Sequence, residues 1–504
     1  MGNTNQETLQ EIGSKANQQS PTSFIKSSVI NLTNATIVSK NKSDPENDYK
    51  IIKKLGQGSH GEVFEAKNRI TDIVRAIKIV KKHGKVLEKD EKEILNEENV
   101  LKTMDHPNIV KIFEFYSNEE KYSIITENCK GGSLLKEIAN NGPFDENYTA
   151  YVMYQLFSAI NYYNGLNIIH RDLKPENVLI ANRNKRNNFP NVKICDFSIS
   201  KIAEGQEMQK NVVNSLLYIA PEILNKNYNE KCDLWSCGII MYMLLSKKPP
   251  FSGTFSDENL EKIKKGEYDI KNPPFDKLSS NALDLLKRLL TVDVNTRITV
   301  QEALQHPWLK DHKIKELYNE ILDEKIAEKL LNNLKKYKKN SIIQETALAY
   351  LVHNFPQMKD VINACKLFNQ IDLNGDGKIT GEELYLGLKK RLNSDTLIED
   401  VKNIFKNLDM DNDGYIEYEE FVRAAVSKEK FMGENVLKFA FRFFDKDDSG
   451  NITFAEIENI FKNSVTDQEH IEEGLNKIID EVDINRDRKI SFEEFSKVMK
   501  KMLD

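Results

Sequence analysis

The chain is short of cysteine, of long hydrophobic runs and of excess charge, and each shortage excludes a class of protein. Five cysteines occur among its 504 residues: Cys129, Cys195, Cys232, Cys237 and Cys365. None of them has metal-ligand spacing, so we expect reduced thiols in an intracellular protein. The formal net charge of −6 argues against nucleic acid as the main partner.

Signals for export or membrane insertion are weak. The first twenty residues contain no apolar segment of the kind that a signal peptide needs. The longest apolar stretch, Leu234 to Leu245, is too short to span a bilayer and fits a buried helix. Gly2 could be myristoylated after removal of Met1, although Gln6 stands where the motif prefers Ser or Thr, and one acyl chain anchors weakly. We expect a cytoplasmic protein with at most weak peripheral membrane binding.

A dense polar motif lies in the first half of the chain. Directly after an apolar pair, the sequence HRDLKPEN (170–177) places the carboxylate of Asp172, the ammonium of Lys174 and the carboxamide of Asn177 on one short loop. Phosphoryl transfer needs a carboxylate that orients and deprotonates the attacking hydroxyl, a cation that neutralises charge and an amide oxygen that binds Mg²⁺. The alternative is a solvated loop that is polar by chance, and the density of chemical groups argues against it.

A glycine-rich turn precedes this motif and predicts a lid over phosphates. It comprises Leu55, Gly56, Gln57, Gly58, Ser59, His60, Gly61, Glu62 and Val63. The G-x-G-x-x-G pattern alone is weak, because dinucleotide-binding folds use the same letters. Here a strand follows instead of a helix, and the next strand ends in Lys78, an order typical of a hairpin lid with a lysine on the α and β phosphates.

Two further segments complete the predicted nucleotide site. A charged helix is expected over roughly residues 88–104, and its register favours Glu97 as the partner of Lys78, with Glu93 and Glu98 as alternatives. A buried strand then ends in a hinge. The backbone of Glu127, Asn128 and Cys129 is expected to bond adenine, with Thr126 at the back of the pocket.

With these motifs, residues 49–309 resemble a eukaryotic protein kinase domain of the calcium/calmodulin-regulated Ser/Thr group. The resemblance implies that Asp172 is the catalytic base, that Lys174 contacts the γ-phosphate and that Asn177 and Asp196 bind Mg²⁺. Ser198 replaces the glycine of the D-F-G motif. Glycine tolerates backbone conformations that serine does not, so the freedom of this loop to flip is in doubt.

The remaining kinase motifs concern the activation segment and the substrate. Arg297 resembles the arginine that pairs with Glu222 of the A-P-E motif. The activation segment carries Glu204, Glu207 and Ser215 but few other hydroxyls, so we expect it to be ordered without phosphorylation. Glu176 matches a residue that selects a basic side chain upstream of the acceptor. Ser133 replaces a second acidic residue, so this preference is expected to be weaker than usual.

The segment after the kinase domain predicts an autoinhibitory junction. Apolar residues recur at helical spacing over residues 324–355, as one long helix or two, around a lysine-rich stretch at 335–339. A basic amphipathic helix beside an acidic calcium module is the usual form of a calmodulin-type target. At low Ca²⁺ we expect a lysine of 335–339 to occupy the substrate cleft near Asp172 and Glu176. Calcium-loaded EF-hands are then expected to expose apolar grooves that capture the junction and pull it away. The alternative is a linker helix with a solvated lysine face.

Four acidic loops repeat at nearly constant spacing in the C-terminal third. Ca²⁺ takes about six to eight oxygen ligands, supplied at positions 1, 3, 5, 7, 9 and 12 of such a loop. The predicted ligands are Asp372, Asn374, Asp376, Lys378 and Glu383; Asp409, Asp411, Asp413, Tyr415 and Glu420; Asp445, Asp447, Ser449, Asn451 and Glu456; and Asp483, Asn485, Asp487, Lys489 and Glu494. Arg488 replaces the turn glycine of the fourth loop, so we expect that loop to bind weakly or not at all.

The order of these parts over residues 49–504 resembles a calcium-dependent protein kinase of the plant and apicomplexan type. The expected fold class is α+β: a bilobal kinase with a β-rich N-lobe and an α-rich C-lobe, then an all-α calmodulin-like domain. The expected segments are a disordered extension (1–48, rich in Asn, Gln, Ser, Thr and Lys), the kinase domain (49–309), the junction (310–358) and four EF-hands (359–394, 396–431, 432–467 and 470–504).

The resemblance implies a monomeric, Ca²⁺-activated Ser/Thr protein kinase that uses ATP and Mg²⁺. Two other functions stay open. One is a catalytically dead calcium-responsive scaffold, which only Ser198 favours. The other is a kinase that needs external calmodulin, with its own EF-hands acting as a calcium buffer.

Overall fold

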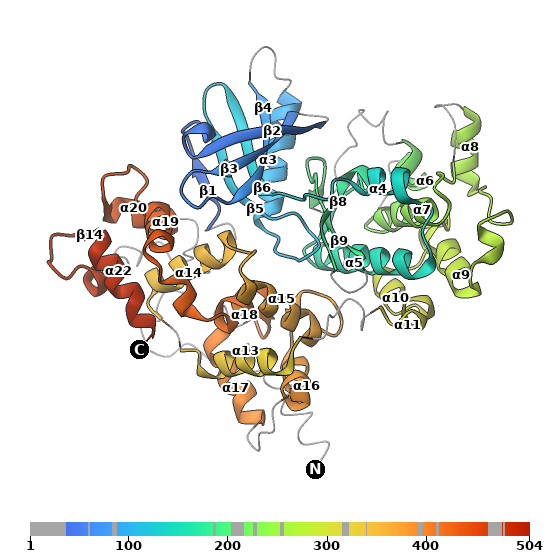
Figure 1. Cartoon of the computed structure of the whole chain (residues 1–504). Helices are drawn as coiled ribbons and strands as arrows, with labels where there is room; N and C mark the ends of the chain where they lie inside the picture. Colours follow the sequence, from blue (N-terminus) through green and yellow to red (C-terminus); the bar gives the residue numbers. More distant parts are fainter. Residues whose placement is uncertain are drawn as a thin grey trace, which may run out of the picture.

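The computed structural model describes most of the chain, in three bodies that contact one another (Figure 1). The described residues are 37–58, 61–82, 88–184, 188–202, 216–224, 229–251, 257–314, 322–338, 340–391, 397–409, 413–461, 476 and 479–503. Several predictions therefore lie outside the described residues. They concern Gly2, Ser59, His60, Glu204, Glu207, Ser215, Lys339 and Asp411.

The N-lobe is a six-stranded sheet in the order β1-β5-β6-β4-β3-β2, with one long helix. Its elements are β1 (Ser39–Asn41), β2 (Tyr49–Gly58), β3 (Gly61–Asn68), β4 (Val74–Lys81), α3 (Glu88–Lys102), β5 (Ile112–Ser117) and β6 (Lys121–Glu127). The strands alternate between two buried faces, as their β-branched and aromatic residues favour. Val80 and Ile124 share a core with Ile94 of α3, whereas Ile77 and Ile125 belong to a separate core on the other face.

Part of the extension that the composition marks as disordered is ordered, so that prediction is wrong for residues 37–48. β1 pairs in parallel with β5 at the edge of the sheet. Ile37 and Val38 are 1% and 4% exposed, and they are buried in two different cores, those of the calcium module and of the kinase. Two isolated apolar residues carry no periodicity, which explains why the composition alone hides them.

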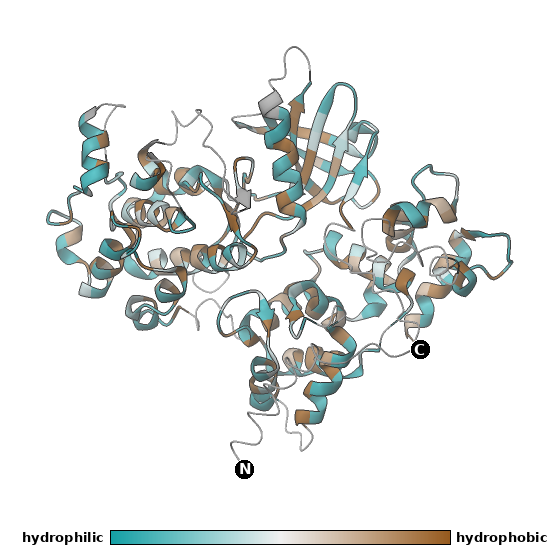
Figure 2. Ribbon diagram, turned by 180° about the vertical axis from the view of Figure 1, so that it is seen from behind, coloured by the Kyte–Doolittle hydropathy of each residue, from teal (hydrophilic) through white to brown (hydrophobic). Residues whose placement is uncertain are grey.

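The C-lobe is mainly helical and is built around α7 (Cys232–Ser246), whose residues from Cys232 to Leu245 are all buried. Apolar residues gather on the sides of helices that face one another (Figure 2). The other elements are α4 (Leu134–Asn141), α5 (Glu146–Gly165), β7 (Ile168–Ile169), β8 (Val178–Arg183), β9 (Pro190–Ile194), β10 (Lys201–Ile202), α6 (Pro221–Leu224), α8 (Asp257–Lys265), α9 (Ser280–Leu289), α10 (Val300–Leu304) and α11 (Pro307–Asp311).

The third body joins the junction to the EF-hands. Its helices are α13 (Glu324–Lys336), α14 (Ile342–Asn354), α15 (Lys359–Ile371), α16 (Gly381–Arg391), α17 (Leu397–Leu408), α18 (Tyr418–Ala425), α19 (Glu434–Phe444), α20 (Phe454–Phe461) and α22 (Phe492–Lys500). β11 (Lys378–Ile379) pairs with β12 (Ile416–Glu417), and β13 (Asn451–Thr453) pairs with β14 (Lys489–Ser491). Each of these two-strand ribbons joins two calcium loops. Short 3₁₀ turns occur at Pro45–Asn47, Pro175–Asn177, Leu216–Tyr218, Phe275–Lys277, Lys428–Phe431 and Lys501–Leu503.

The junction forms two helices that contact the EF-hands, which is the intramolecular contact that the sequence predicts for the calcium-loaded protein. α13 ends at Lys336 with Tyr337 as its C-cap, and a capping box at Ser341 starts α14. α13 packs against α15 to α18, and α14 packs against α18 and α19. Lys335 pairs with Asp400 of α17 at 2.8 Å. In this arrangement Lys335 therefore does not lie in the substrate cleft, because the apolar face of α13 beside it is buried by the EF-hands.

The calcium module packs against both kinase lobes. Against the N-lobe, the Arg75 guanidinium lies over the Phe113 ring and donates to the Asn354 carbonyl at the end of α14, and His353 Nε2 donates to the Ile112 carbonyl at 2.7 Å. Against the C-lobe, the Asn161 carboxamide of α5 donates to the Gly375 carbonyl in the first calcium loop. None of the described helices is long and apolar enough to cross a bilayer.

Candidate active site and calcium centres

The catalytic loop brings its three predicted groups together. Asp172 accepts a hydrogen bond from Lys174 Nζ at 2.7 Å, and Asn177 Nδ2 donates to the Asp172 carbonyl and carboxylate at 2.9 and 3.2 Å. The loop is held by Asp233, a residue at the start of α7 whose side chain is buried, with 1% of its surface exposed. Its carboxylate accepts the backbone N–H groups of His170 and Arg171 at 2.9 and 3.0 Å. The sequence predicts a buried helix over Leu234 to Leu245, but the supporting role of Asp233 just before it is revealed only by the fold.

The nucleotide-binding lysine is paired as its position in β4 requires. Lys78 Nζ lies 2.6 Å from Glu97 Oε2 and 3.3 Å from Asp196 Oδ1. Of the alternatives to Glu97, Glu98 instead contacts Lys40 and Lys102. Burial alone would raise the pKa of Asp196, but Lys78 and the Ser198 hydroxyl outweigh burial and lower that pKa to about 2. Asp196 is therefore ionised, as a metal ligand must be.

The glycine-rich segment forms the expected hairpin between β2 and β3. Gly58 pairs with Gly61 and Gly56 pairs with Val63. A Cβ on Gly61 would lie 2.3 Å from the Ile79 carbonyl oxygen, so only glycine fits there. Leu55 stays 38% exposed on the hairpin, and Glu62 is fixed by Lys54 at 2.5 Å. This geometry fits a lid over the phosphates.

The hinge uses one of its backbone donors inside the protein. The Glu127 N–H donates to the Lys111 carbonyl at 3.0 Å, and the Glu127 carboxylate pairs with Lys193 at 2.7 Å. The Asn128 carboxamide donates to Glu65 at 2.8 Å. Adenine would therefore be bonded by the Glu127 carbonyl and the Cys129 N–H, a narrower set than the sequence suggests.

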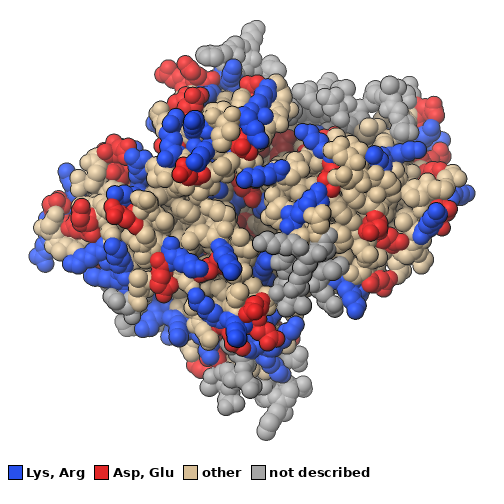
Figure 3. Space-filling model, viewed as in Figure 1, with Lys and Arg blue, Asp and Glu red and all other residues tan. Residues whose placement is uncertain are grey.

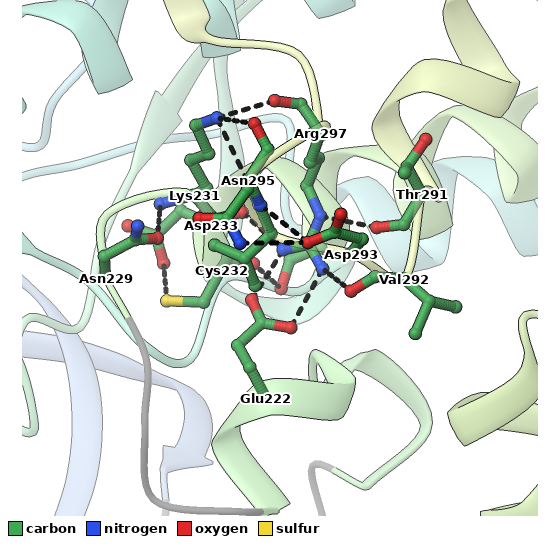
Figure 4. Close-up of polar contacts among 12 residues, drawn as sticks. Glu222, Asn229, Lys231, Cys232, Asp233, Thr291, Val292, Asp293, Asn295 and Arg297 are labelled. Carbon is green, nitrogen blue, oxygen red and sulfur yellow. Dashed lines mark hydrogen bonds and ion pairs between the residues drawn. The ribbon is translucent and has the colours of Figure 1, made fainter.

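The end of the activation segment is fixed by a buried ion pair (Figure 4). Arg297 is 1% exposed and binds both carboxylate oxygens of Glu222, at 2.5 and 2.8 Å. The Lys231 carbonyl accepts a further hydrogen bond from Arg297 at 2.9 Å. A bidentate, fully bonded pair fixes geometry well, and removing either partner would leave a costly buried charge.

Calcium loops one, three and four share one backbone arrangement. The position-12 glutamates Glu383, Glu456 and Glu494 each accept N–H groups from loop positions 2, 3 and 9. In the third loop, ligand atoms of Asp445, Asp447 and Glu456 lie within 4.8 Å of one another. These hard oxygen groups, already directed inward, fit Ca²⁺.

The fourth loop keeps this arrangement without glycine. Its first aspartate, Asp483, accepts the N–H groups of Arg486 and Arg488 at 2.7 Å. Both arginines have φ of 62°, the left-handed conformation that Gly375 and Gly377 adopt in the first loop. A non-glycine residue in this conformation costs roughly 1–2 kcal/mol. Weak calcium binding by the fourth loop therefore stays our prediction, with backbone strain as its cause.

The first calcium loop lies directly on the kinase. A Cβ on Gly377 would come within 2.5 Å of the Tyr162 ring of α5, whereas one on Gly450 of the third loop would meet nothing within 4 Å. Phe368 and Tyr418 of the module, with Tyr154 and Ser158 of α5, line a small cavity of about 10 Å³ beside this contact. Basic and acidic side chains are intermingled over the outer face of the molecule seen in Figure 3.

Comparisons with known proteins agree with this geometry. Residues 49–309 match the protein kinase domain family, and residues 363–426 and 434–500 match the EF-hand domain pair. The chain is 34% identical over 464 residues to calcium-dependent protein kinase 4 of Plasmodium falciparum (isolate 3D7), which covers 90% of this chain and 86% of that protein. It is 36% identical over 466 residues to calcium-dependent protein kinase 5 of the same organism, with 92% and 80% covered. Calcium-dependent protein kinase 3 of Plasmodium berghei (strain Anka) is 36% identical over 461 residues, with 88% and 79% covered.

The fold and site thus define a protein kinase fused to EF-hands, with the predicted α+β architecture. The chain belongs to the calcium-dependent protein kinases. It is a Ca²⁺-activated Ser/Thr protein kinase that uses ATP and Mg²⁺, as predicted.

The catalytic groups explain how the chain transfers a phosphoryl group. Asp172 is placed to take the proton of the substrate hydroxyl, whose oxygen would then attack the γ-phosphorus of ATP while the bond from that phosphorus to the bridging oxygen breaks and ADP leaves. Lys174, which contacts the Asp172 carboxylate in this structure, is placed to neutralise charge on the transferred group. Lys78, paired with Glu97, is placed to contact the α and β phosphates. Asn177 and Asp196 would hold Mg²⁺, which supplies charge neutralisation between the phosphates when bound.

Proposed function

We propose that this kinase prefers protein substrates with a basic residue upstream of the acceptor Ser or Thr, and that the preference is weaker than usual. Glu176 lies in the catalytic loop, and its Oε2 is buried with no hydrogen-bond partner among the described residues. A buried carboxylate oxygen of this kind gains a charge-assisted bond from a guanidinium. Ser133 accepts from the Lys136 N–H as the N-cap of α4 and contributes no charge.

Peptides that carry one arginine at successive upstream positions would test this preference. E176Q should reduce kcat/KM for the best arginine peptide by about tenfold, the value of one charged hydrogen bond. A peptide without basic residues should lose less than about twofold. An equal loss on both peptides would contradict the role of Glu176 while leaving kinase activity itself intact.

We further propose that the described arrangement is the calcium-activated form. At low Ca²⁺ the junction (310–358) would leave the EF-hands and block the substrate cleft with a lysine of 335–339. The observation that carries this proposal is the burial of Ala327, Leu330, Leu331 and Leu334 of α13 against the EF-hands. Sensor EF-hands expose such a groove when loaded with Ca²⁺. External calmodulin would find this face of the junction already occupied.

A peptide kinase assay of the purified full-length chain tests whether its own EF-hands relieve autoinhibition. Activity with Ca²⁺ and without calmodulin, and little activity in EGTA, is expected. Equal rates in both conditions would overturn autoinhibition, and a strict need for added calmodulin would favour the external-activator alternative.

We propose that the protein is a cytoplasmic monomer that reaches membranes only weakly, and only if Gly2 is acylated. Light scattering of the pure protein should give the mass of one chain, near 58.1 kDa. Fractionation of cells that express the native chain and G2A should show the same soluble majority, with any small membrane fraction lost in G2A. A dominant membrane fraction would overturn the proposal.

A further inference from the structure

Asn96 of α3 donates hydrogen bonds to the backbone that follows the metal-binding residue Asp196. Asn96 Nδ2 lies 3.2 Å from the Phe197 carbonyl, 3.1 Å from the Ser198 carbonyl and 3.0 Å from the Ser200 carbonyl. A carboxamide nitrogen carries two hydrogens, so these acceptors share them. A single side chain thus contacts three carbonyls within the four residues that follow Asp196.

The same segment is fixed from within. The Ser200 hydroxyl donates to the Phe197 carbonyl at 2.6 Å, and the Ser200 N–H donates to that carbonyl at 3.1 Å. Phe197 is fully buried, and its ring packs against His170 with centroids 4.6 Å apart. These contacts therefore fix the backbone of the segment whose carbonyls accept from Asn96.

Ser198 fits this conformation without strain. Asp196 has φ of 67°, but Ser198 is not among the described residues with positive φ, so its Cβ costs nothing here. Ser198 is 5% exposed, and its hydroxyl bonds the Asp196 carboxylate. A flipped loop would break this bond and would demand backbone angles that glycine reaches more readily than serine. The departure from D-F-G thus favours one orientation of the loop.

Asn96 directly precedes Glu97, which holds Lys78 at 2.6 Å. The position of α3 and the orientation of Asp196 are therefore linked through neighbouring residues of one helix. We infer that Asn96 and Ser198 are positioning residues that hold Asp196 in its metal-binding orientation whenever α3 carries Glu97 to Lys78. Neither residue touches the reacting atoms. Asn96 acts through the backbone that follows Asp196, and Ser198 acts through the Asp196 carboxylate.

Substitutions of Asn96 in the full-length chain at saturating Ca²⁺ test this role. N96A should raise the Mg²⁺ concentration for half-maximal activity by about tenfold, the value of one to two ordinary hydrogen bonds. The KM for the peptide should stay within about twofold, because the substrate does not meet Asn96. N99A is the matched control, since Asn99 is exposed on the same helix, and it should behave as the native enzyme.

N96D separates hydrogen-bond donation from shape. Asp has the size of Asn but offers only oxygens to the three carbonyls, so N96D should be worse than N96A. If side-chain volume alone mattered, N96D would be better than N96A. A value for N96A within twofold of N99A, or an N96D better than N96A, would overturn the inference. Thermal melting of each variant identifies any loss of folding, which would lower kcat without changing the Mg²⁺ requirement.

S198G provides a second and milder test. Restoring glycine removes the bond to Asp196 and frees the loop, so the Mg²⁺ requirement should rise by about threefold, less than one full hydrogen bond to a charged group. In the double variant N96A/S198G the effects should not add, because both residues hold one segment. Independent, additive effects would show that the two residues do not act on a common element and would overturn the joint role.

Discussion

The two EF-hand pairs differ in how directly they meet the kinase. The first pair places the turn glycine of its first loop against Tyr162 of the C-lobe and encloses α13. The second pair touches the amino-terminal strand, where Lys446 lies 3.1 Å from Ser39 Oγ, and carries two arginines in strained positions of its last loop. The first pair is thus built to report calcium to the catalytic domain through close packing. The second pair keeps the EF-hand shape, but we expect the strain in its last loop to weaken its calcium binding.

The largest effect should come from removing the bidentate ligand of the docked loop. E383Q should raise the Ca²⁺ concentration for half-maximal activity by more than about tenfold, because the loop loses charge at position 12. E494Q is the matched change in the fourth loop and should shift it by less than about twofold. Peptide phosphorylation at buffered free Ca²⁺ measures both. Equal shifts would remove the distinction between the two pairs.

A matched glycine pair should sharpen the comparison. G377A and G450A both place alanine in a left-handed conformation, at a cost of roughly 1 kcal/mol. Only G377A also drives a Cβ toward Tyr162. We expect the calcium requirement to rise about fivefold for G450A and clearly more for G377A. If G450A had the larger effect in the same assay, the contact with α5 would not couple calcium to the kinase.

Repair of the fourth loop should have a smaller effect of opposite sign. R488G removes one strained residue and one positive charge, so calcium should bind this loop about fivefold more tightly, as expected for roughly 1 kcal/mol. Isothermal titration of the full-length chain measures the change, and R488K serves as the control that keeps the strain. A fourth loop that already binds as tightly as the first would contradict the strain argument.

The smallest effect should come from the surface pair of the junction. K335A removes the contact with Asp400. The side chains of Lys335 and Asp400 are 28% and 14% exposed, and such ion pairs contribute about 0–1 kcal/mol to the free energy of unfolding. The melting temperature in Ca²⁺ should fall by no more than a few degrees. A large loss for K335A, but not for the charge-swapped K335D/D400K, would show that this pair governs capture of the junction.

Contiguous motifs made most of the active site predictable. The catalytic octet, the glycine hairpin and the calcium loops each fix their chemistry within about a dozen residues, so local sequence suffices. The pairing of Lys78 with Glu97 could be predicted from the register of the one helix that carries Glu97. The contact of Lys335 with Asp400 could not be predicted, because the sequence gives an amphipathic face but does not say which groove buries it.

The contacts that sequence could not predict join distant segments. Asn96 binds carbonyls a hundred residues away in the chain, and its type alone suggests only a polar helix face. Ile37 and Val38 lie in a polar stretch, yet each enters a different core. Arg75 meets the end of α14 only after the lobes and the junction have assembled. Such contacts depend on tertiary geometry, for which a single chain offers no periodic signal.

The strand β1 has a consequence for whatever precedes it. Its two anchors, Ile37 and Val38, sit on opposite sides of the seam between kinase and calcium module, and Lys40 reaches Glu98 on α3. A force applied at the amino terminus would therefore act first on this seam, and would separate the calcium module from the kinase before it unfolded either one.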